Sequence, residues 1–219
     1  MSFQKARDLI NDSILFESIV AFNTKFKESS TKPLVLNKLQ QLLYDKDSSL
    51  FIFKRMQEPY VFIPFYKKPQ RLCLIDKKTL EHLALYLGAS VLHKSLLNIL
   101  FKKDREYLFS FLDKKIYDFT LSYARYALPL DIVDNNIIKV DELYNEILKS
   151  GFKLMLSLCG MLEDKRLEEY YKDIIDNMCP NISDNANYNM DDTQVNSIYK
   201  LCIHILTKEI DSKWLRYFA

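Results

Sequence analysis

The sequence predicts a mainly α-helical protein, for three reasons. Of its 219 residues, 48% are hydrophobic, which is enough for an ordinary core and argues against a disordered chain. Only three glycines occur, Gly88, Gly151 and Gly160, which argues against a turn-rich β fold and against glycine-rich phosphate loops. Apolar residues recur at three- and four-residue steps in most segments. We therefore expect residues 1–219 to form a single helical domain around one buried helix.

A central helix is predicted over about 76–102. Its first apolar residues lie at helical spacing and share one face: Leu80, Leu83, Ala84, Leu87 and Val91. Further leucines and isoleucines up to residue 100 widen this face, and a helix that is apolar over so much of its surface is covered on several sides. Asp76 or Thr79 is the expected N-cap. The helix is expected to end near Lys102 and Lys103, because cations are favourable at the carbonyl end.

Two helices are predicted at the amino-terminal end. Residues 3–27 carry helically spaced apolar side chains, and a polar connection rich in serine and threonine follows. Pro33 is suited to the first turn of a second helix, which is expected to run to about Tyr44.

Residues 45–75 differ, because they contain three short apolar and aromatic runs, at 50–53, 60–63 and 71–75. Three prolines interrupt these runs and prevent a continuous helix: Pro59, Pro64 and Pro69. Short runs between helix breakers are typical of small strands or extended loops. We expect a small β-hairpin or an extended segment at about 50–75, within an amino-terminal part that spans 1–75.

More helices are predicted after the central one. Residues 106–126 restart the helical pattern with an inner side that includes Leu108, Phe109 and Leu112, and Pro129 ends it. Residues 132–140 are expected to be irregular or briefly extended.

The next predicted helix spans 141–162, where Gly151 and Gly160 weaken it locally and Gly160 marks a bend. A shorter helix follows at 166–178 and completes a helical core over 76–178.

The chain is expected to close with a loop and one more helix. Residues 179–192 are dense in Asn and Asp, whose side chains compete with helix by bonding their own backbone. Asp192 or Thr193 is the expected N-cap of a last helix in the carboxyl-terminal part, 193–219.

No arrangement of residues with recognisable chemistry is visible. His82 and His93 would share a face of the central helix, but they lie about 16 Å apart along its axis, too far to ligate one ion. No nucleophile-elbow pattern surrounds a serine, and adjacent acids such as Glu168 and Glu169 are most simply a solvated helix face. We expect no catalytic, metal-binding or cofactor-binding residues, and therefore a protein that is not an enzyme.

Composition also bounds the compartment and the partners. The four cysteines are scattered without a Cys-x-x-Cys pair, which favours buried thiols in a reducing compartment. The amino terminus has no apolar signal region, and uncharged runs such as 82–93 are far shorter than the roughly 20 residues that span a bilayer, so we expect a cytoplasmic protein. With 31 basic and 29 acidic residues, nothing indicates nucleic acid.

Paired basic residues occur at four places: Lys67-Lys68, Lys77-Lys78, Lys102-Lys103 with Arg105, and Lys114-Lys115. The simplest interpretation is that they are solvated helix ends and faces, since acidic residues interleave them. The alternative is contact with an acidic protein partner or a membrane surface.

Aromatic residues at two places are candidate partner contacts, in the proline-broken segment 50–70 and at the carboxyl end. They are Phe51, Phe53, Tyr60, Phe62, Phe65, Tyr66, Trp214 and Phe218. Tryptophan is enriched at interface hot spots, so replacing Trp214 by alanine is expected to lose partner binding while the fold survives. The alternative is that Trp214 seals the edge of the core and the aromatic segment packs as a strand or loop.

The segment Leu83–Leu96 resembles the SctK family of type III secretion injectisomes, also called the YscK or OrgA type. The similarity lies in Leu87-Gly88, Leu92-His93 and Leu96. Two more segments are similar in the family's order: Ser150–Phe152, opening an apolar helix that ends at Met178–Pro180, and Leu201–Lys208 continuing to Trp214 and Phe218. Together the similarities cover roughly residues 80–219.

This resemblance implies a non-enzymatic adaptor of the cytoplasmic sorting platform, a component of virulence-associated protein transport. Such adaptors link the cytoplasmic domain of the SctD-type inner-membrane ring protein to the pod built from the SctQ-type protein. The pod connects through the SctL stator to the SctN ATPase. The implied location is the cytoplasm at the base of the injectisome, peripheral to the inner membrane.

Two other functions remain open from the residues alone. One is a helical chaperone or regulatory protein that binds a short partner helix, which a contiguous exposed apolar groove along 141–178 would favour. The other is an enzyme with a site scattered through the helices, which a cavity joining His93 or His204 to a cysteine or carboxylate would favour.

Overall fold

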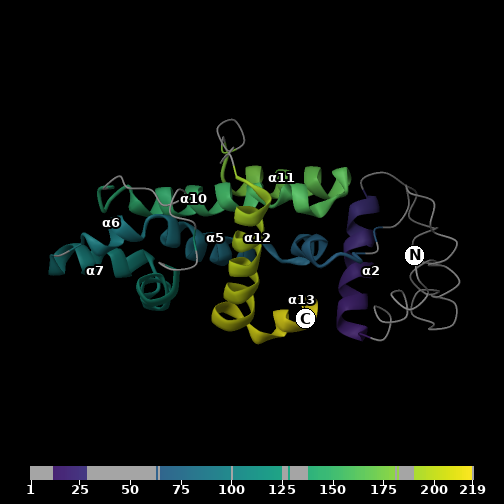
Figure 1. The fold of residues 1–219 in the computed structure, drawn as a ribbon, viewed down its shortest axis with the longest axis horizontal. Coiled ribbons are helices and arrows are strands. Elements are labelled where there is room, and N and C mark those ends of the chain that lie inside the picture. Colours follow the sequence, from purple (N-terminus) through teal and green to yellow (C-terminus); the bar gives the residue numbers. More distant parts are fainter. Residues whose placement is uncertain are drawn as a thin grey trace, which may run out of the picture. The chain divides into compact units, whose positions relative to one another are not determined.

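A computed structural model describes residues 12–28, 63, 65–99, 101–124, 128, 138–180, 182 and 190–218 (Figure 1). These residues are mainly helical and contain no β-strand, which confirms the predicted mainly α fold class. The chain divides into two compact units, Met1–Leu74 with Ala219 and Ile75–Phe218. The division falls where the central helix was predicted to begin.

In the first unit, the structure describes helix α2 (Ser13–Glu28) and the 3₁₀-helix η1 (Lys68–Leu74). The buried Asn23 side chain connects α2 to the backbone near η1: its Nδ2 donates to the Ile63 carbonyl at 2.9 Å and its Oδ1 accepts from the Ile63 amide at 2.7 Å. Phe22 packs edge to face on Phe65, with ring centroids 4.8 Å apart. These contacts hold the backbone near Ile63 against α2.

Two predictions for this unit are tested in part. Helix α2 confirms the first predicted helix from Ser13 onward. The prediction of a strand or extended segment for the apolar run at 71–75 was wrong, because most of this run lies in η1. Proline suits the start of a helix, so Pro69 is compatible with this 3₁₀ turn, which buries Leu72 and Cys73. The predicted helix at 33–44 and the runs at 50–53 and 60–62 lie outside the described residues.

The second unit is built on helix α5 (Lys77–Val91), followed by the short helix α6 (His93–Leu97). Asp76, one of the two caps predicted, is the N-cap, and its Oδ1 accepts from the amide of Thr79, the other candidate, at 3.0 Å. The predicted end near residue 102 was wrong, because the helix breaks at Leu92. Leu92 and Leu96 are both buried, so the apolar pattern continues through the break although the helix does not.

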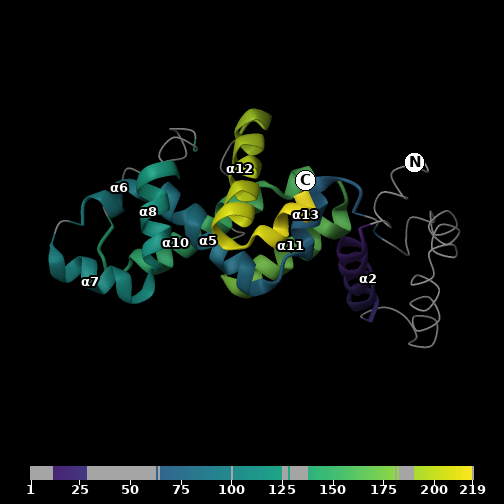
Figure 2. The ribbon, with the colours of Figure 1, turned by 90° about the horizontal axis from the view of Figure 1, so that it is seen from below.

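Helix α5 crosses helix α10 (Leu143–Ser157) at two glycines, and the two helices run side by side in Figures 1 and 2. A Cβ atom on Gly88 would lie 1.7 Å from the Ile147 carbonyl oxygen, and one on Gly151 would lie 1.9 Å from the Ala84 carbonyl oxygen. Only glycine permits this approach, since real Cβ atoms do not come so close to backbone. Gly151, which was predicted to weaken its helix locally, therefore allows close packing of α10 on α5 together with Gly88.

Helices α7 (Lys102–Phe111) and α8 (Lys114–Phe119) replace the single helix predicted over 106–126. Helix α7 ends at Leu112, and Asp113 caps α8 by accepting from the Lys115 amide at 2.8 Å. A π-helical turn, η2 (Thr120–Ala124), continues α8 and packs on α5 together with it. Lys102 and Lys103 thus begin a helix instead of ending one.

The rest of the unit follows the predicted order. A 3₁₀ turn, η3 (Cys159–Leu162), ends α10 with Gly160 in the bend, and helix α11 (Lys165–Met178) packs beside it. Helix α12 (Asp192–His204) is capped by Asp191, which forms a capping box with Gln194. The cap was predicted one or two residues too late, because the reciprocal bonds of Gln194 favour Asp191.

The chain closes with a π-helical segment η5 (Ile205–Ile210), a 3₁₀ turn η6 (Ser212–Trp214) and the short helix α13 (Leu215–Phe218). Segment η5 packs on α5, so α5 is covered by α10, by η5 and by the α8–η2 segment. This confirms the buried central helix. Among the described residues, no helix has both the length and the apolar character needed to cross a membrane.

Candidate partner-binding surface

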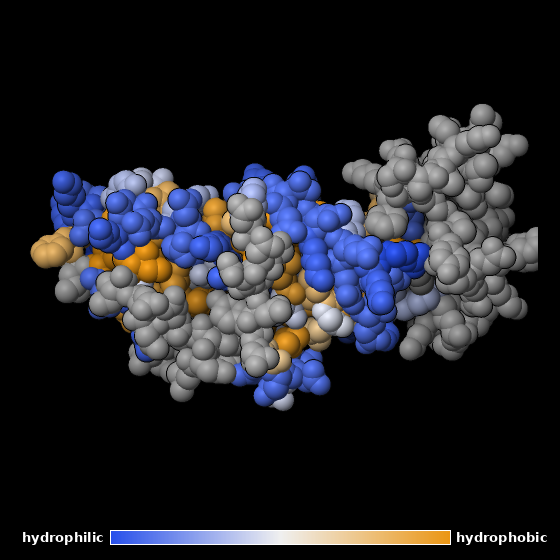
Figure 3. Space-filling model, turned by 90° about the horizontal axis from the view of Figure 1, so that it is seen from above, coloured by the Kyte–Doolittle hydropathy of each residue, from blue (hydrophilic) through white to orange (hydrophobic). Residues whose placement is uncertain are grey.

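Most of the exposed large hydrophobic side chains that the structure describes lie on or between α6 and α7 of the second unit. Six described large hydrophobic residues are exposed, and four of them lie between residues 97 and 109. Their exposed fractions are 48% for Leu97, 75% for Phe101, 48% for Tyr107 and 40% for Phe109. Figure 3 shows hydrophobic surface among hydrophilic residues at the end where Figure 1 places α6 and α7. Because these exposed residues lie on adjacent elements, this end of the unit is the candidate interaction surface.

Helix α7 carries most of this surface because it lies at the edge of the unit. Leu108 is its only buried residue, and α7 packs extensively on no other described element. Figures 1 and 2 both place α7 at the end of the unit that is far from α12 and α13. Among the described elements α7 therefore has few neighbours, and most of its side chains are exposed.

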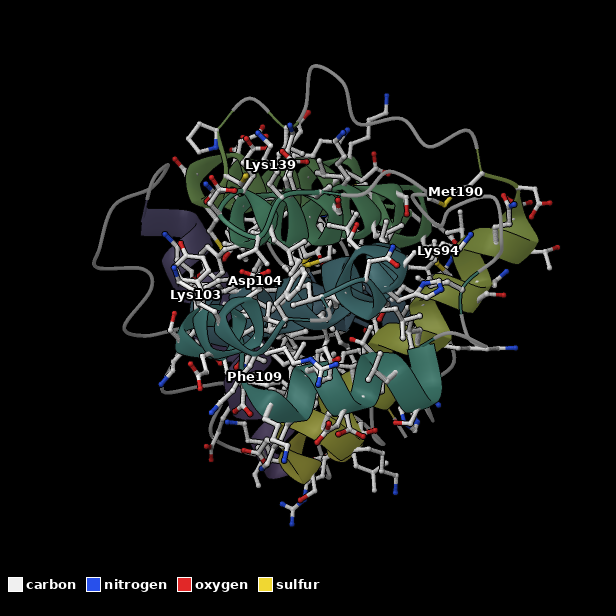
Figure 4. All side chains as sticks on the ribbon, turned by 90° about the vertical axis from the view of Figure 1, so that its left-hand side faces the viewer. Lys94, Lys103, Asp104, Phe109, Lys139 and Met190 are labelled. Atoms are coloured by element: carbon white, nitrogen blue, oxygen red, sulfur yellow. The ribbon has the colours of Figure 1, made fainter. Side chains whose placement is uncertain are left out.

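Phe101, the N-cap of α7, is followed at four-residue steps by Arg105 and Phe109, and the last two share one flank of the helix. We call these three residues the Phe–Arg–Phe stripe. Phe109 packs edge to face on Tyr117 of α8, with ring centroids 5.3 Å apart at 88°, and Figure 4 shows it on the α8 side of α7. The Arg105 Nε donates to the Ile99 carbonyl at 3.0 Å. The contacts fix the direction of two of the three side chains.

The opposite flank of α7 is also aromatic. Tyr107 packs edge to face on Phe111 at 5.5 Å, and Phe111 on Tyr144 of α10 at 5.4 Å, so the rings join α7 to the core helix. Burial raises the pKa of Tyr144, and the charge of Glu81 adds to the effect. The phenol therefore stays protonated and remains a hydrogen-bond donor at neutral pH.

The segment that carries these residues has a small excess of positive charge. Residues 93–122 contain six basic and four acidic residues, which gives the segment a net charge of +2. Two of the four acids have local roles: Glu106 pairs with Lys102 at 3.7 Å, and Asp113 caps α8. The surface is therefore weakly basic, with aromatic rings between the charges.

The predicted contact residues that the structure describes are not among these exposed side chains. Phe65 is buried in the first unit beside Tyr66, which is half-buried, and burial raises the pKa of Tyr66 to about 12. Trp214 and Phe218 are buried in the second unit. This burial favours the alternative in which these aromatics pack inside the fold. The other predicted contacts, Phe51, Phe53, Tyr60 and Phe62, lie outside the described residues and stay predictions.

The stripe was not predicted from the sequence, because its two phenylalanines were assigned to two helices with other boundaries. Phe101 was placed inside the central helix, and Phe109 on the inner side of the next helix. The structure instead makes Phe101 the N-cap of α7 and leaves Phe109 exposed. The signal that was available is the sequence Phe101-Lys102-Lys103-Asp104, in which charged residues follow a phenylalanine at once, as they do at the start of a solvent-exposed helix.

The groups considered for chemistry have ordinary structural contacts. The Nδ1 of His93 lies 3.1 Å from the Ser90 carbonyl oxygen, and His204 stacks on Phe119 at 6.3 Å. Burial raises the pKa values of Cys159 and Cys202 to about 12, so both thiols are protonated at neutral pH. In the described ranges, no group of three or more His, Cys, Asp or Glu residues could hold a metal ion.

Comparison with protein families, with curated proteins and with solved structures gives no match to this chain. The class that the fold and the surface define is a helical protein with an exposed aromatic and basic edge.

Proposed function

We propose that this protein is a non-enzymatic adaptor of the cytoplasmic sorting platform of a type III secretion injectisome. It links the cytoplasmic domain of an SctD-type ring protein to an SctQ-type pod protein, and through the pod it is connected to the SctL stator and the SctN ATPase. The observation that carries a protein-binding role is the exposed aromatic edge formed by α6, α7 and α8. The choice of partners comes from the sequence resemblance to the SctK family.

The location of the resembling segments supports the use of that resemblance. Leu87-Gly88 lies on α5 and Ser150–Phe152 on α10, and the two meet at the crossing where Gly88 and Gly151 allow close backbone contact. Segments far apart in the chain that resemble one family thus belong to a single packing unit. The resemblance concerns residues that hold the core together, and proteins that share a fold have such core contacts in common.

The proposed place of action is the cytoplasm at the base of the injectisome, peripheral to the inner membrane. The adaptor reaches the membrane through the ring protein and needs no membrane insertion of its own. Its contribution is to hold two partners at a fixed separation, for which a helical unit with a closely packed core is suited.

Co-purification tests the proposal. The full chain is expressed with a pod subunit and, separately, with the cytoplasmic domain of the ring protein from the same secretion gene cluster. We expect a stable complex with each, detected by size-exclusion chromatography with light scattering. A folded protein that binds neither partner would count against the adaptor function.

A second candidate is a helical chaperone or regulatory protein for a short partner helix, which the exposed flanks of α7 also suit. An exposed apolar groove along 141–178 would have favoured it, but none of the exposed large hydrophobic residues in the described part of the chain lies there. Binding to an isolated peptide of a secreted protein, without binding to the pod or ring domains, would favour this candidate.

A further inference from the structure

We infer that the Phe–Arg–Phe stripe is a docking site for an amphipathic helix of a partner protein. The partner helix places an acidic side chain on Arg105, and the apolar side chains on either side of that acid contact Phe101 and Phe109. The inference deepens the proposed adaptor function, on which it rests for the existence of a protein partner. Three observations on α7 support it.

The first observation is the position of Phe101. It is the N-cap of α7 and makes no side-chain capping bond, although Ser, Thr, Asp and Asn are strongly preferred there because they accept a bond from the first turn. The side chain is also 75% exposed, so it adds little to the core. Neither helix stability nor core packing explains a phenylalanine at this position, whereas an aromatic anchor for a partner does.

The second observation is the preset orientation of Arg105. Its Nε donates to the Ile99 carbonyl at 3.0 Å, which holds the guanidinium plane at the surface. In the part of the chain that the structure describes, Arg105 makes no ion pair, so both terminal amino groups are open to a ligand. A guanidinium presents donors in a planar fork that matches a carboxylate, and holding the side chain in advance reduces the entropy lost on binding.

The third observation is the spacing. Phe101 and Phe109 lie eight residues apart, which is about 12 Å along a helix, with Arg105 midway. A partner helix lying along α7 matches this pattern when apolar, acidic and apolar residues follow one another at four-residue steps. Tyr117, which packs on Phe109, widens the apolar end of the site.

The charges favour such a protein partner over an anionic membrane. The excess of basic residues in 93–122 complements an acidic helix. However, acids occur beside the stripe, with Asp104 next to Arg105 in sequence and Glu106 paired with Lys102. Figure 4 shows Asp104 and Lys103 together at this end of α7. A bilayer surface would be repelled by these carboxylates, whereas a single carboxylate directed at Arg105 avoids them.

The test uses two fluorescent helical peptides of about 18 residues, a length at which helices become stable in water. One carries a glutamate four residues from a leucine on each side, and the other carries lysine in place of that glutamate. We expect the full-length protein to bind the glutamate peptide at least about tenfold more tightly than the lysine peptide in fluorescence anisotropy. Equal binding of the two peptides, or no binding of either, would overturn the inference.

Three variants separate docking from folding. Arg105→Glu is expected to reverse the preference toward the lysine peptide, and Phe101→Ser to weaken glutamate-peptide binding at least about fivefold. Because serine is a good N-cap, Phe101→Ser is also expected to leave Tm unchanged or raise it by about 2–4 °C, so lost binding would not reflect unfolding. The control is Arg216→Glu on α13, an exposed arginine away from α7, which should change neither binding nor preference.

Two further measurements distinguish this inference from the adaptor function. If the pod or ring domain binds wild type and Arg105→Glu equally, the adaptor function stands and the docking site is wrong. If neither domain binds but the peptide preference holds and reverses, the docking site stands and the partners are wrong. A third measurement uses vesicles of phosphatidylserine and phosphatidylcholine. If wild type binds these vesicles, Phe101→Ser does not, and neither peptide binds, then the stripe docks on a membrane and the inferred protein partner is wrong.

Discussion

Gly88 and Gly151 show how single residues set the packing of the second unit. At each glycine, a backbone carbonyl of the opposite helix occupies the space in which a side chain would begin. Helices α5 and α10 therefore approach more closely than larger residues would permit. The third glycine, Gly160, differs from the other two, because a Cβ atom added there would have no neighbouring atom within 4 Å.

Gly151→Ala is expected to destabilise the protein by about 1–3 kcal/mol or more, because the new methyl group meets backbone atoms that can yield only if the helices separate. Urea unfolding followed by circular dichroism measures the change. Gly160→Ala is the matched control, and it should be neutral or slightly stabilising, since alanine has less conformational freedom to lose on folding. Equal stability of the two variants would show that α5 and α10 are not in close contact.

Trp214→Ala is expected to lower the free energy of unfolding by about 3–5 kcal/mol, because the side chain is buried and packs on Tyr217 with ring centroids 4.9 Å apart. The sequence led to a different expectation, namely that the Trp214→Ala variant keeps its fold and loses partner binding. Thermal unfolding and co-purification with the pod subunit, measured on the same sample, separate the two. An unchanged Tm with lost binding would restore Trp214 as a contact residue.

At the scale of single elements, caps fix where helices begin. Asp164 caps α11: its Oδ1 accepts from the Arg166 amide at 3.0 Å, and its Oδ2 accepts from the Arg166 guanidinium at 2.7 Å. The hydrogen bond from the Arg166 side chain is the main cause of a pKa for Asp164 below its usual value, and partial burial opposes it. The ionised carboxylate thus contributes to the stability of α11.

This contribution has a definite pH dependence. Because the folded-state pKa of Asp164 is lowered, the stabilisation is complete above the unfolded-state value near 3.8 and is lost as the pH falls through the folded-state value. Asp164→Asn should therefore be less stable than wild type at neutral pH, and the difference should shrink below about pH 4. Urea unfolding at a series of pH values measures it. A difference that stays constant down to about pH 2 would mean that the carboxylate charge has no role.

At the scale of the whole molecule, the division into two compact units predicts that the second one folds alone. Residues 75–219 contain the α5–α10 crossing and the elements that cover α5. We expect this fragment to be helical by circular dichroism and to unfold cooperatively on heating. A fragment that lacks a cooperative transition would show that the residues before Ile75 are needed to complete the core, as the single domain predicted from the sequence requires.

Local features of the fold were predictable from the sequence. The first predicted helix, the cap at Asp76 and the helix near 166–178 follow from apolar spacing and capping residues, which act over one or two turns of chain. The break at Leu92 was not predictable in the same way, because the residues on both sides of it are buried and keep the helical period. The 3₁₀-helix at Lys68–Leu74 was missed because prolines and short apolar runs also suit extended chain.

The sequence by itself determined that the protein is helical, where α5, α10, α11 and α12 begin to within two residues, and that no familiar catalytic motif is present in the chain. Only the tertiary structure decided which helix faces meet and which stay open. The role of Gly88 depends on Gly151, which lies far away in the chain, and the exposure of Phe101 and Phe109 depends on how little the other described elements pack on α7. The physical reason is that apolar spacing records a preference for burial, whereas burial itself requires another surface at the same place.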